Sequence, residues 1–158
     1  MIALQGWRED WKKIIRTVIF KDYELRRLMK LPSKTGVIQF ADRYFIRAGF
    51  TNKLLTDEVC RIVYADIPGK DTENPNVRRN MMMFDVYVKN EEQRNVSDDG
   101  LDTRSEMIVE RLYKLLTQQR YLAGTGFRFW IAWGPEDLGT RTPGYSRTTI
   151  AFYYMKVY

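Results

Sequence analysis

Hydrophobic side chains recur at helical spacing near the N-terminus, with charged side chains on the opposite side of the same cylinder. The hydrophobic positions are Leu4, Trp7, Trp11, Ile14, Ile15 and Val18, and they predict an amphipathic first helix. A second, shorter helix is predicted to begin at Asp22, a residue type that caps helix N-termini, and to stop before Pro32. Residues 37–50 are apolar and aromatic without a clear period, so they predict an irregular or short-strand connection.

From residue 59 onwards the pattern becomes typical of β-strands. Branched side chains over residues 59–64, followed by the turn signal Pro68-Gly69, predict a first strand. Residues 81–88 alternate with period two, which predicts a second strand, antiparallel to the first. The apolar face of this second strand consists of Met82, Phe84, Val86 and Val88.

A third helix is predicted after Ser97-Asp98-Asp99, whose side chains can cap it, and it is expected to end in the region of Gly124 and Gly126. Its expected buried positions are Leu101, Ile108, Leu112, Leu115 and Leu116, with Glu110 and Lys114 paired on the solvent side. Two strands follow, over residues 127–133 and 147–157. The order α-α-β-β-α-β-β predicts an α+β fold, with packed helices on a small mixed, mostly antiparallel four-stranded β-sheet.

The length of 158 residues predicts one domain, residues 1–158, with a helical N-terminal part, 1–58, and a sheet-plus-helix part, 59–158. The formal net charge is +6, and residues 1–58 hold 12 basic and 7 acidic side chains, so +5 lies there. Such a charge attracts nucleic acid or acidic protein surfaces, and it also keeps a small domain in solution. The N-terminal apolar runs are too short for a signal peptide or a membrane span, which predicts a cytosolic origin and no membrane partner.

The composition removes most familiar catalytic chemistry. With no His and one Cys, the chain lacks the parts of a His-based triad, a His or Cys zinc site and an internal disulfide. Cys60 lies among arginine and aliphatic residues of a predicted strand and is interpreted as a small buried hydrophobe. The acidic residues 66, 71 and 73 do not have calcium-loop spacing. We therefore expect no enzyme activity, cofactor or metal.

Aromatic side chains number 22, and they occupy both faces of the last two predicted strands. Simple alternation puts Phe127, Phe129, Ile131 and Trp133 on one face of the first strand, and Trp130 and Ala132 on the other. A small sheet covered by helices on one side leaves part of its second face exposed to solvent, which favours association with another protein molecule. Either neighbouring subunits or the chain's own helices and residues 37–50 cover that face. Residues 149–157 are also aggregation-prone on an open edge, so we expect them to be paired or covered.

This arrangement resembles the tail terminator, or tail completion, proteins of long-tailed bacteriophages, which join head and tail at the neck. The resemblance is carried by the element order, by the strand through Phe84 and Tyr87 running through a polar loop into the helix of residues 107–116, and by the final strand. That strand contains Ala151-Phe152-Tyr153-Tyr154.

The resemblance implies a structural virion protein that assembles with itself as a ring, expected to be a hexamer, in the host cytoplasm. The ring would cap the tube formed by the tail tube protein and dock onto a head connector or stopper protein. DNA would pass through its central channel without sequence-specific contact. Residues 68–80 and 134–144 are the expected contact loops. The expected interface side chains are Arg78, Arg79, Arg141, Trp130 and Tyr153.

A basic nucleic-acid-binding module of a phage or bacterium is the alternative function. In that case cations of the two N-terminal helices would contact phosphates, and binding would fall steeply with salt. These cations are Lys12, Lys13, Arg16, Arg26, Arg27 and Lys30.

Overall fold

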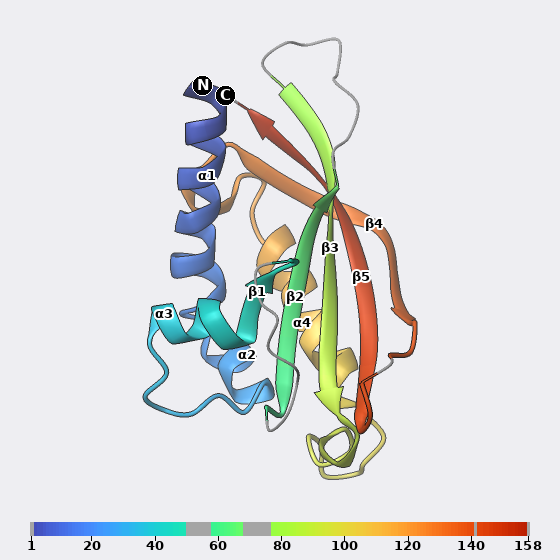
Figure 1. Cartoon of the computed structure of the whole chain (residues 1–158). Helices are drawn as coiled ribbons and strands as arrows, with labels where there is room; N and C mark the ends of the chain where they lie inside the picture. The colour runs from blue at the N-terminus through green and yellow to red at the C-terminus, as the bar shows by residue number, and fades with distance from the viewer. Residues whose placement is uncertain (1, 50–57, 68–76, 141, 158) are drawn as a thin grey trace.

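Five strands form one sheet in the computed structural model, which describes residues 2–49, 58–67, 77–140 and 142–157 (Figure 1). They are β1 (Phe45–Arg47), β2 (Cys60–Ile67), β3 (Val77–Lys89), β4 (Phe127–Asp137) and β5 (Tyr145–Val157). Their order across the sheet is β1-β2-β3-β5-β4, with β1 parallel to β2 and all other neighbours antiparallel. The predicted α+β class is confirmed, whereas the prediction of four strands in the order α-α-β-β-α-β-β is wrong.

The additional strand, β1, arises from residues 37–50, whose sequence has no clear period. Phe45 and Ile46 are both buried, and Ile46 lies opposite Val63 of β2. A strand of three residues is too short to show alternation, so its conformation depends on the edge of β2 that it joins. The preceding residues form two short helical turns, α3 (Val37–Gln39) and the π-helical η2 (Phe40–Tyr44).

The two predicted N-terminal helices are confirmed. The first, α1 (Ile2–Ile14), continues into a π-helical turn, η1 (Ile15–Ile19), and its Trp11 and Ile14 side chains are buried. The second, α2 (Tyr23–Leu28), begins where a carboxylate oxygen of Asp22 accepts a hydrogen bond from the Leu25 backbone N–H at 2.8 Å. This is the N-cap contact that the sequence predicts.

The long helix, α4 (Arg104–Thr117), begins later and ends earlier than predicted. Thr103 is its N-cap, and the 3-10 turns η3 (Asn90–Glu92) and η4 (Leu122–Gly124) lie before and after it. Asp99 instead accepts a hydrogen bond from the Leu101 backbone N–H, which forms a turn and leaves Leu101 81% exposed. The predicted burial of Leu101 and capping by residues 97–99 are therefore wrong. The other predicted stripe residues are buried: Ile108, Leu112, Leu115 and Leu116.

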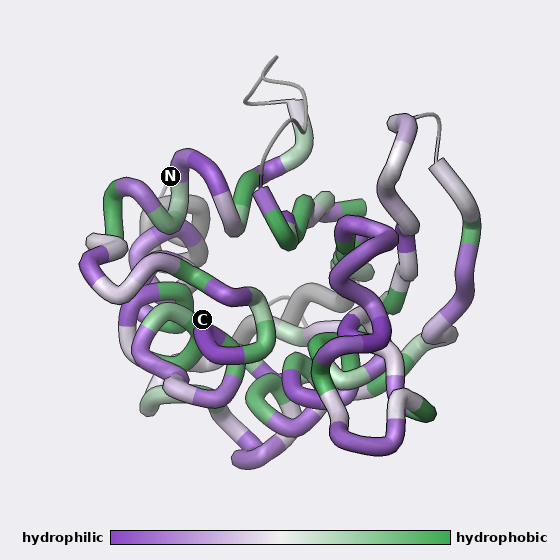
Figure 2. The backbone as a smooth tube through the Cα atoms, turned by 90° about the horizontal axis from the view of Figure 1, so that it is seen from below, coloured by the Kyte–Doolittle hydropathy of each residue, from purple (hydrophilic) through white to green (hydrophobic). Residues whose placement is uncertain are grey.

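The hydrophobic core lies between the helices and one face of the sheet. Trp11 of α1 packs edge-on against Tyr64 of β2, with ring centroids 5.5 Å apart, and it also contacts Phe127 and Phe129 of β4. Phe84 and Phe152 meet edge to face at the sheet centre, 5.8 Å apart. Figure 2, seen from below, shows hydrophilic segments in many of the outer turns at that end. Apolar burial is therefore concentrated on one side of the sheet.

An ion pair joins α2 to α4 across the surface of this core. The Arg111 guanidinium donates to both carboxylate oxygens of Asp22, at 2.6 and 2.8 Å, and the Asp22 carboxylate also caps α2. Burial opposes ionisation of Asp22, but the hydrogen bonds from Arg111 and Leu25 and the charge of Arg111 outweigh it. The pKa of Asp22 is therefore lowered, and its ionised form stabilises the fold.

Replacing Asp22 by asparagine is expected to lower the free energy of unfolding by about 1 kcal/mol at neutral pH, because asparagine retains the cap but not the ion pair. The folded-state pKa is lowered, so this contribution is complete above the ordinary value of 3.8 and disappears as the pH falls through the folded-state pKa. Urea unfolding at several pH values measures it, with the exposed Asp98→Asn as control. A difference that stayed constant at strongly acidic pH would contradict the assignment.

Candidate interaction surface

The second face of the sheet carries apolar side chains that no helix of the described residues buries. Trp130 of β4 lies opposite Tyr153 of β5, with ring centroids 6.1 Å apart, and Tyr153 lies opposite Met81 of β3. These side chains are half-buried, in contrast to the fully buried residues that alternate with them. The open sheet face, as we call it, consists of Met81, Met83, Trp130, Trp133, Tyr153 and Met155.

A β-bulge sets the position of Trp133 on this face. The register of β4 against β5 shifts between Ile131 and Trp133, and Trp133 lies opposite Ala151, two residues from Tyr153. Neighbouring residues two apart on a strand share a face, so Trp133 lies on the side of Trp130. The expected alternation, with Trp133 beside Phe127 and Phe129, is therefore wrong. Ile131, the last residue in register before the shift, is 39% exposed.

Polar groups border the apolar part of the open sheet face. Arg147 of β5 lies opposite Tyr87, and its Nε is buried without a hydrogen-bond partner among the described residues. Nearby, the Thr149 hydroxyl donates to the Asp85 carboxylate on the neighbouring strand. Apolar and aromatic side chains beside an arginine are a composition typical of protein interfaces.

The structure brings together two of the five predicted interface residues, Trp130 and Tyr153. Arg78 and Arg79 lie in β3, in register with Lys156 and Met155, but their side chains are outside the described part of the chain, and so is Arg141. Sequence reasoning missed Met81 and Met83, although both alternate with the predicted buried positions Met82 and Phe84. That alternation marks the second face of a strand.

The two predicted contact loops are partly strand. Within residues 68–80, β3 already begins at Val77, and within residues 134–144, β4 continues to Asp137 through the cis peptide Gly134-Pro135. Gly134 has φ +93°, and a Cβ there would lie 2.7 Å from the Thr149 carbonyl oxygen. Glycine at position 134 permits this close approach to β5.

The strand of residues 149–157 is paired on both edges, as expected. It forms part of β5, with β3 on one side and β4 on the other. The chain therefore satisfies the backbone of this segment by itself. What is left for a partner is the open sheet face and not the edge of β5.

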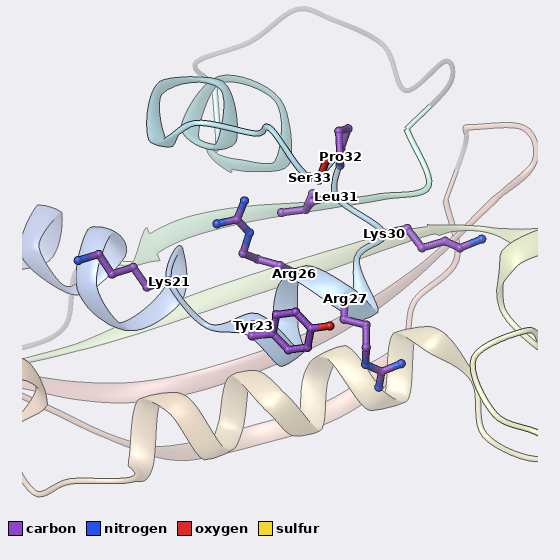
Figure 3. Close-up of a pocket in the computed structure, with 8 residues that line it drawn as sticks. All are labelled: Lys21, Tyr23, Arg26, Arg27, Lys30, Leu31, Pro32 and Ser33. Carbon is purple, nitrogen blue, oxygen red and sulfur yellow. The ribbon is translucent and has the colours of Figure 1, made fainter.

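A basic groove lies on the other side of the molecule, around α2 (Figure 3). The α2 groove, of about 470 Å³, is lined mainly by Lys21, Tyr23, Arg26, Arg27, Lys30 and Pro32. Several of the cations proposed for phosphate contacts have internal partners. Arg27 pairs with Glu24, Lys30 with Glu92 at 2.9 Å, and Lys12 with Glu9 at 3.7 Å. The guanidinium of Arg26 lies over the Phe20 ring, 4.8 Å from its centroid.

The described residues hold no group of three or more His, Cys, Asp or Glu side chains placed to bind a metal ion. Within the same residues, every helix is too short or too polar to cross a membrane. Cys60 is fully buried, and burial raises the pKa of its thiol to about 12. Its side chain packs in the hydrophobic core, as its interpretation as a small hydrophobe predicts.

Native Cys60 is expected to resist alkylation by iodoacetamide at about pH 8, because the reactive thiolate is scarce and the sulfur is inaccessible. Mass spectrometry should find modification only after urea unfolds the chain. A Ser33→Cys variant places a thiol at an exposed position and should react without urea. Equal rates for Cys60 in the folded and unfolded chain would show that its burial is wrong.

No protein-family model matches the sequence, and no curated protein matches it significantly.

Proposed function

We propose that this chain is a structural virion protein that forms a ring at the top of a phage tail, caps the tail tube and joins it to the head connector or stopper protein. One observation carries the proposal: the open sheet face leaves Trp130, Trp133 and Tyr153 only half-buried. Burying a fully exposed side chain of this size contributes about 1.5–3 kcal/mol, and the part of each ring still exposed contributes a fraction of that, so a contiguous set of them favours association. The resemblance to tail terminator proteins supplies the kind of assembly.

The proposed mechanism is binding alone. Contacts between two different surfaces of one chain repeat around a rotation axis and close into a ring, expected to be a hexamer, which stops growing once closed. The ring presents one side to the tail tube and the other to the connector, with a channel through which DNA passes without sequence-specific contact. Such a protein needs no cofactor and no catalytic group, and its final location is the virion.

Electron microscopy of particles assembled without this protein tests the proposal. We expect tail tubes of irregular length beside full heads that carry no tail, because nothing stops tube growth or joins the two parts. Supplying the wild-type chain from a plasmid should restore normal virions. Virions of normal tail length and normal attachment in its absence would refute the proposed function.

A further inference from the structure

The α2 groove has cations and exposed apolar surface but no acidic side chain among its lining residues (Figure 3). The Lys21 side chain is exposed and has no ion pair or hydrogen bond with any described residue. Tyr23 is 78% exposed, which is unusual for an aromatic ring on a helix that otherwise packs well. The groove therefore offers an unpaired ammonium group at one end and an uncovered aromatic ring farther along, with the Lys21 side chain pointing away from the Tyr23 ring (Figure 3).

The end of β4 has the opposite character. Glu136, Asp137 and Leu138 are consecutive and exposed, and we call them the β4 tip. The Glu136 carboxylate has no ion pair or hydrogen bond with any described residue, and Leu138 is 46% exposed. The backbone holds the tip in place, since the Leu138 N–H donates to the Arg147 carbonyl at 3.2 Å. The Gly139 N–H donates to one Asp137 carboxylate oxygen, also at 3.2 Å.

The two surfaces lie on opposite flanks of the molecule. In Figure 1, α2 is at the lower left and the end of β4 is at the lower right, with the sheet between them. They cannot neutralise each other within one chain. Two complementary surfaces on opposite flanks are the arrangement that head-to-tail contacts between identical subunits require.

We infer that the β4 tip of one copy docks into the α2 groove of the next copy, with Glu136 against Lys21 and Leu138 against Tyr23. This contact rests on the proposed function, for which it supplies the lateral contact of the ring. An acidic peptide segment suits the groove better than a nucleic acid does. Glu24 and Glu92 already pair with Arg27 and Lys30, so the groove keeps few unpaired cations: too few for the many charges of a phosphate backbone, but enough for the short acidic β4 tip.

Charge reversal with rescue tests the contact. Lys21→Glu alone and Glu136→Lys alone should each weaken self-association about tenfold in low-salt sedimentation, because each puts like charges together. The double variant, Lys21→Glu with Glu136→Lys, should regain most of the affinity, because it restores opposite charges. Lys13→Glu, which reverses an exposed cation of α1 outside the groove, is the matched control and should assemble like wild type.

Equal self-association of all four variants would overturn the inference, and so would a double variant that associates as weakly as the single variants. Neither result would refute the proposed ring, whose lateral contact would then lie elsewhere. A wild-type chain that stays monomeric alone also overturns the inference, whereas the virion experiment decides the proposed function separately. A third result would overturn the inference and identify the α2 groove as a nucleic-acid site. It is the binding of labelled single-stranded or duplex DNA at low salt that Lys21→Glu abolishes while self-assembly stays unchanged.

Discussion

Replacing Trp130 and Tyr153 together by threonine is expected to weaken self-assembly, or binding to the tail tube, at least about 100-fold. The two rings lie opposite each other on the open sheet face and are half-buried in the isolated chain. Aromatic side chains at the centre of an interface each contribute about 2 kcal/mol or more to binding. Threonine has a high β-propensity, so the strands are expected to remain paired. Sedimentation velocity with and without tail tube protein measures the effect.

A matched control separates loss of binding from loss of folding. Tyr121→Thr removes another exposed aromatic ring, 39% exposed and outside β4 and β5, and it should assemble like wild type. The double threonine variant should keep the far-ultraviolet circular dichroism spectrum and most of its urea midpoint. Full assembly of that variant would show that the open sheet face is not an interface, and the main support for the proposed function would be lost.

Arg104→Ala is expected to give the largest loss of stability, about 3 kcal/mol or more in the free energy of unfolding. Arg104 is 3% exposed, and its guanidinium joins α4 to the distant end of α2 and to residues 92–95. It donates to the Leu28 carbonyl at the end of α2 at 2.6 Å, to the Glu92 carbonyl of η3 at 2.9 Å, and to the Asn95 side-chain oxygen at 2.6 Å. Alanine leaves these acceptors without their donor and opens a cavity.

Urea unfolding of Arg104→Ala, Arg104→Lys and Arg94→Ala separates the stability that comes from the hydrogen bonds of the guanidinium from the stability that comes from its positive charge. Arg104→Lys keeps the positive charge but supplies one donor group in place of the planar fork, so it should recover only part of the loss. Arg94→Ala removes an exposed arginine of the preceding segment and should cost less than about 0.5 kcal/mol. A wild-type urea midpoint for Arg104→Ala would mean that α2, η3 and α4 are not held together by this side chain.

The helices were predictable because their signals are local. The helical spacing of Trp11 and Ile14, the Asp22 cap and the stripe through Ile108 and Leu112 are each complete within one or two turns of chain, and the structure confirms them. The start of α4 was predicted wrongly because two capping signals compete. Residues 97–99 form a turn by themselves, while Gln93 accepts from the Ser105 backbone N–H at 3.0 Å and helps Thr103 begin the helix.

The interaction surface was only half predictable. Trp130 and Tyr153 follow from alternation along each strand, but their neighbours Met81 and Trp133 depend on how the strands are paired. The bulge that moves Trp133 is a property of the β4–β5 register. That the side chains of Lys21 and Glu136 have no ion pair within the described part of the chain is likewise invisible in the sequence, because only the folded structure shows which charged residues pair.

The sequence by itself determined the helices, the strands with clear alternation, the α+β class and the absence of histidine chemistry. Tertiary structure alone decided that Phe45–Arg47 is a strand, that β5 lies between β3 and β4, and that the described helices leave one face of the sheet uncovered. The physical reason is the range of the interactions. Helical hydrogen bonds and alternation act between residues a few positions apart, whereas strand pairing, bulges and the covering of a sheet face depend on segments far away in the chain.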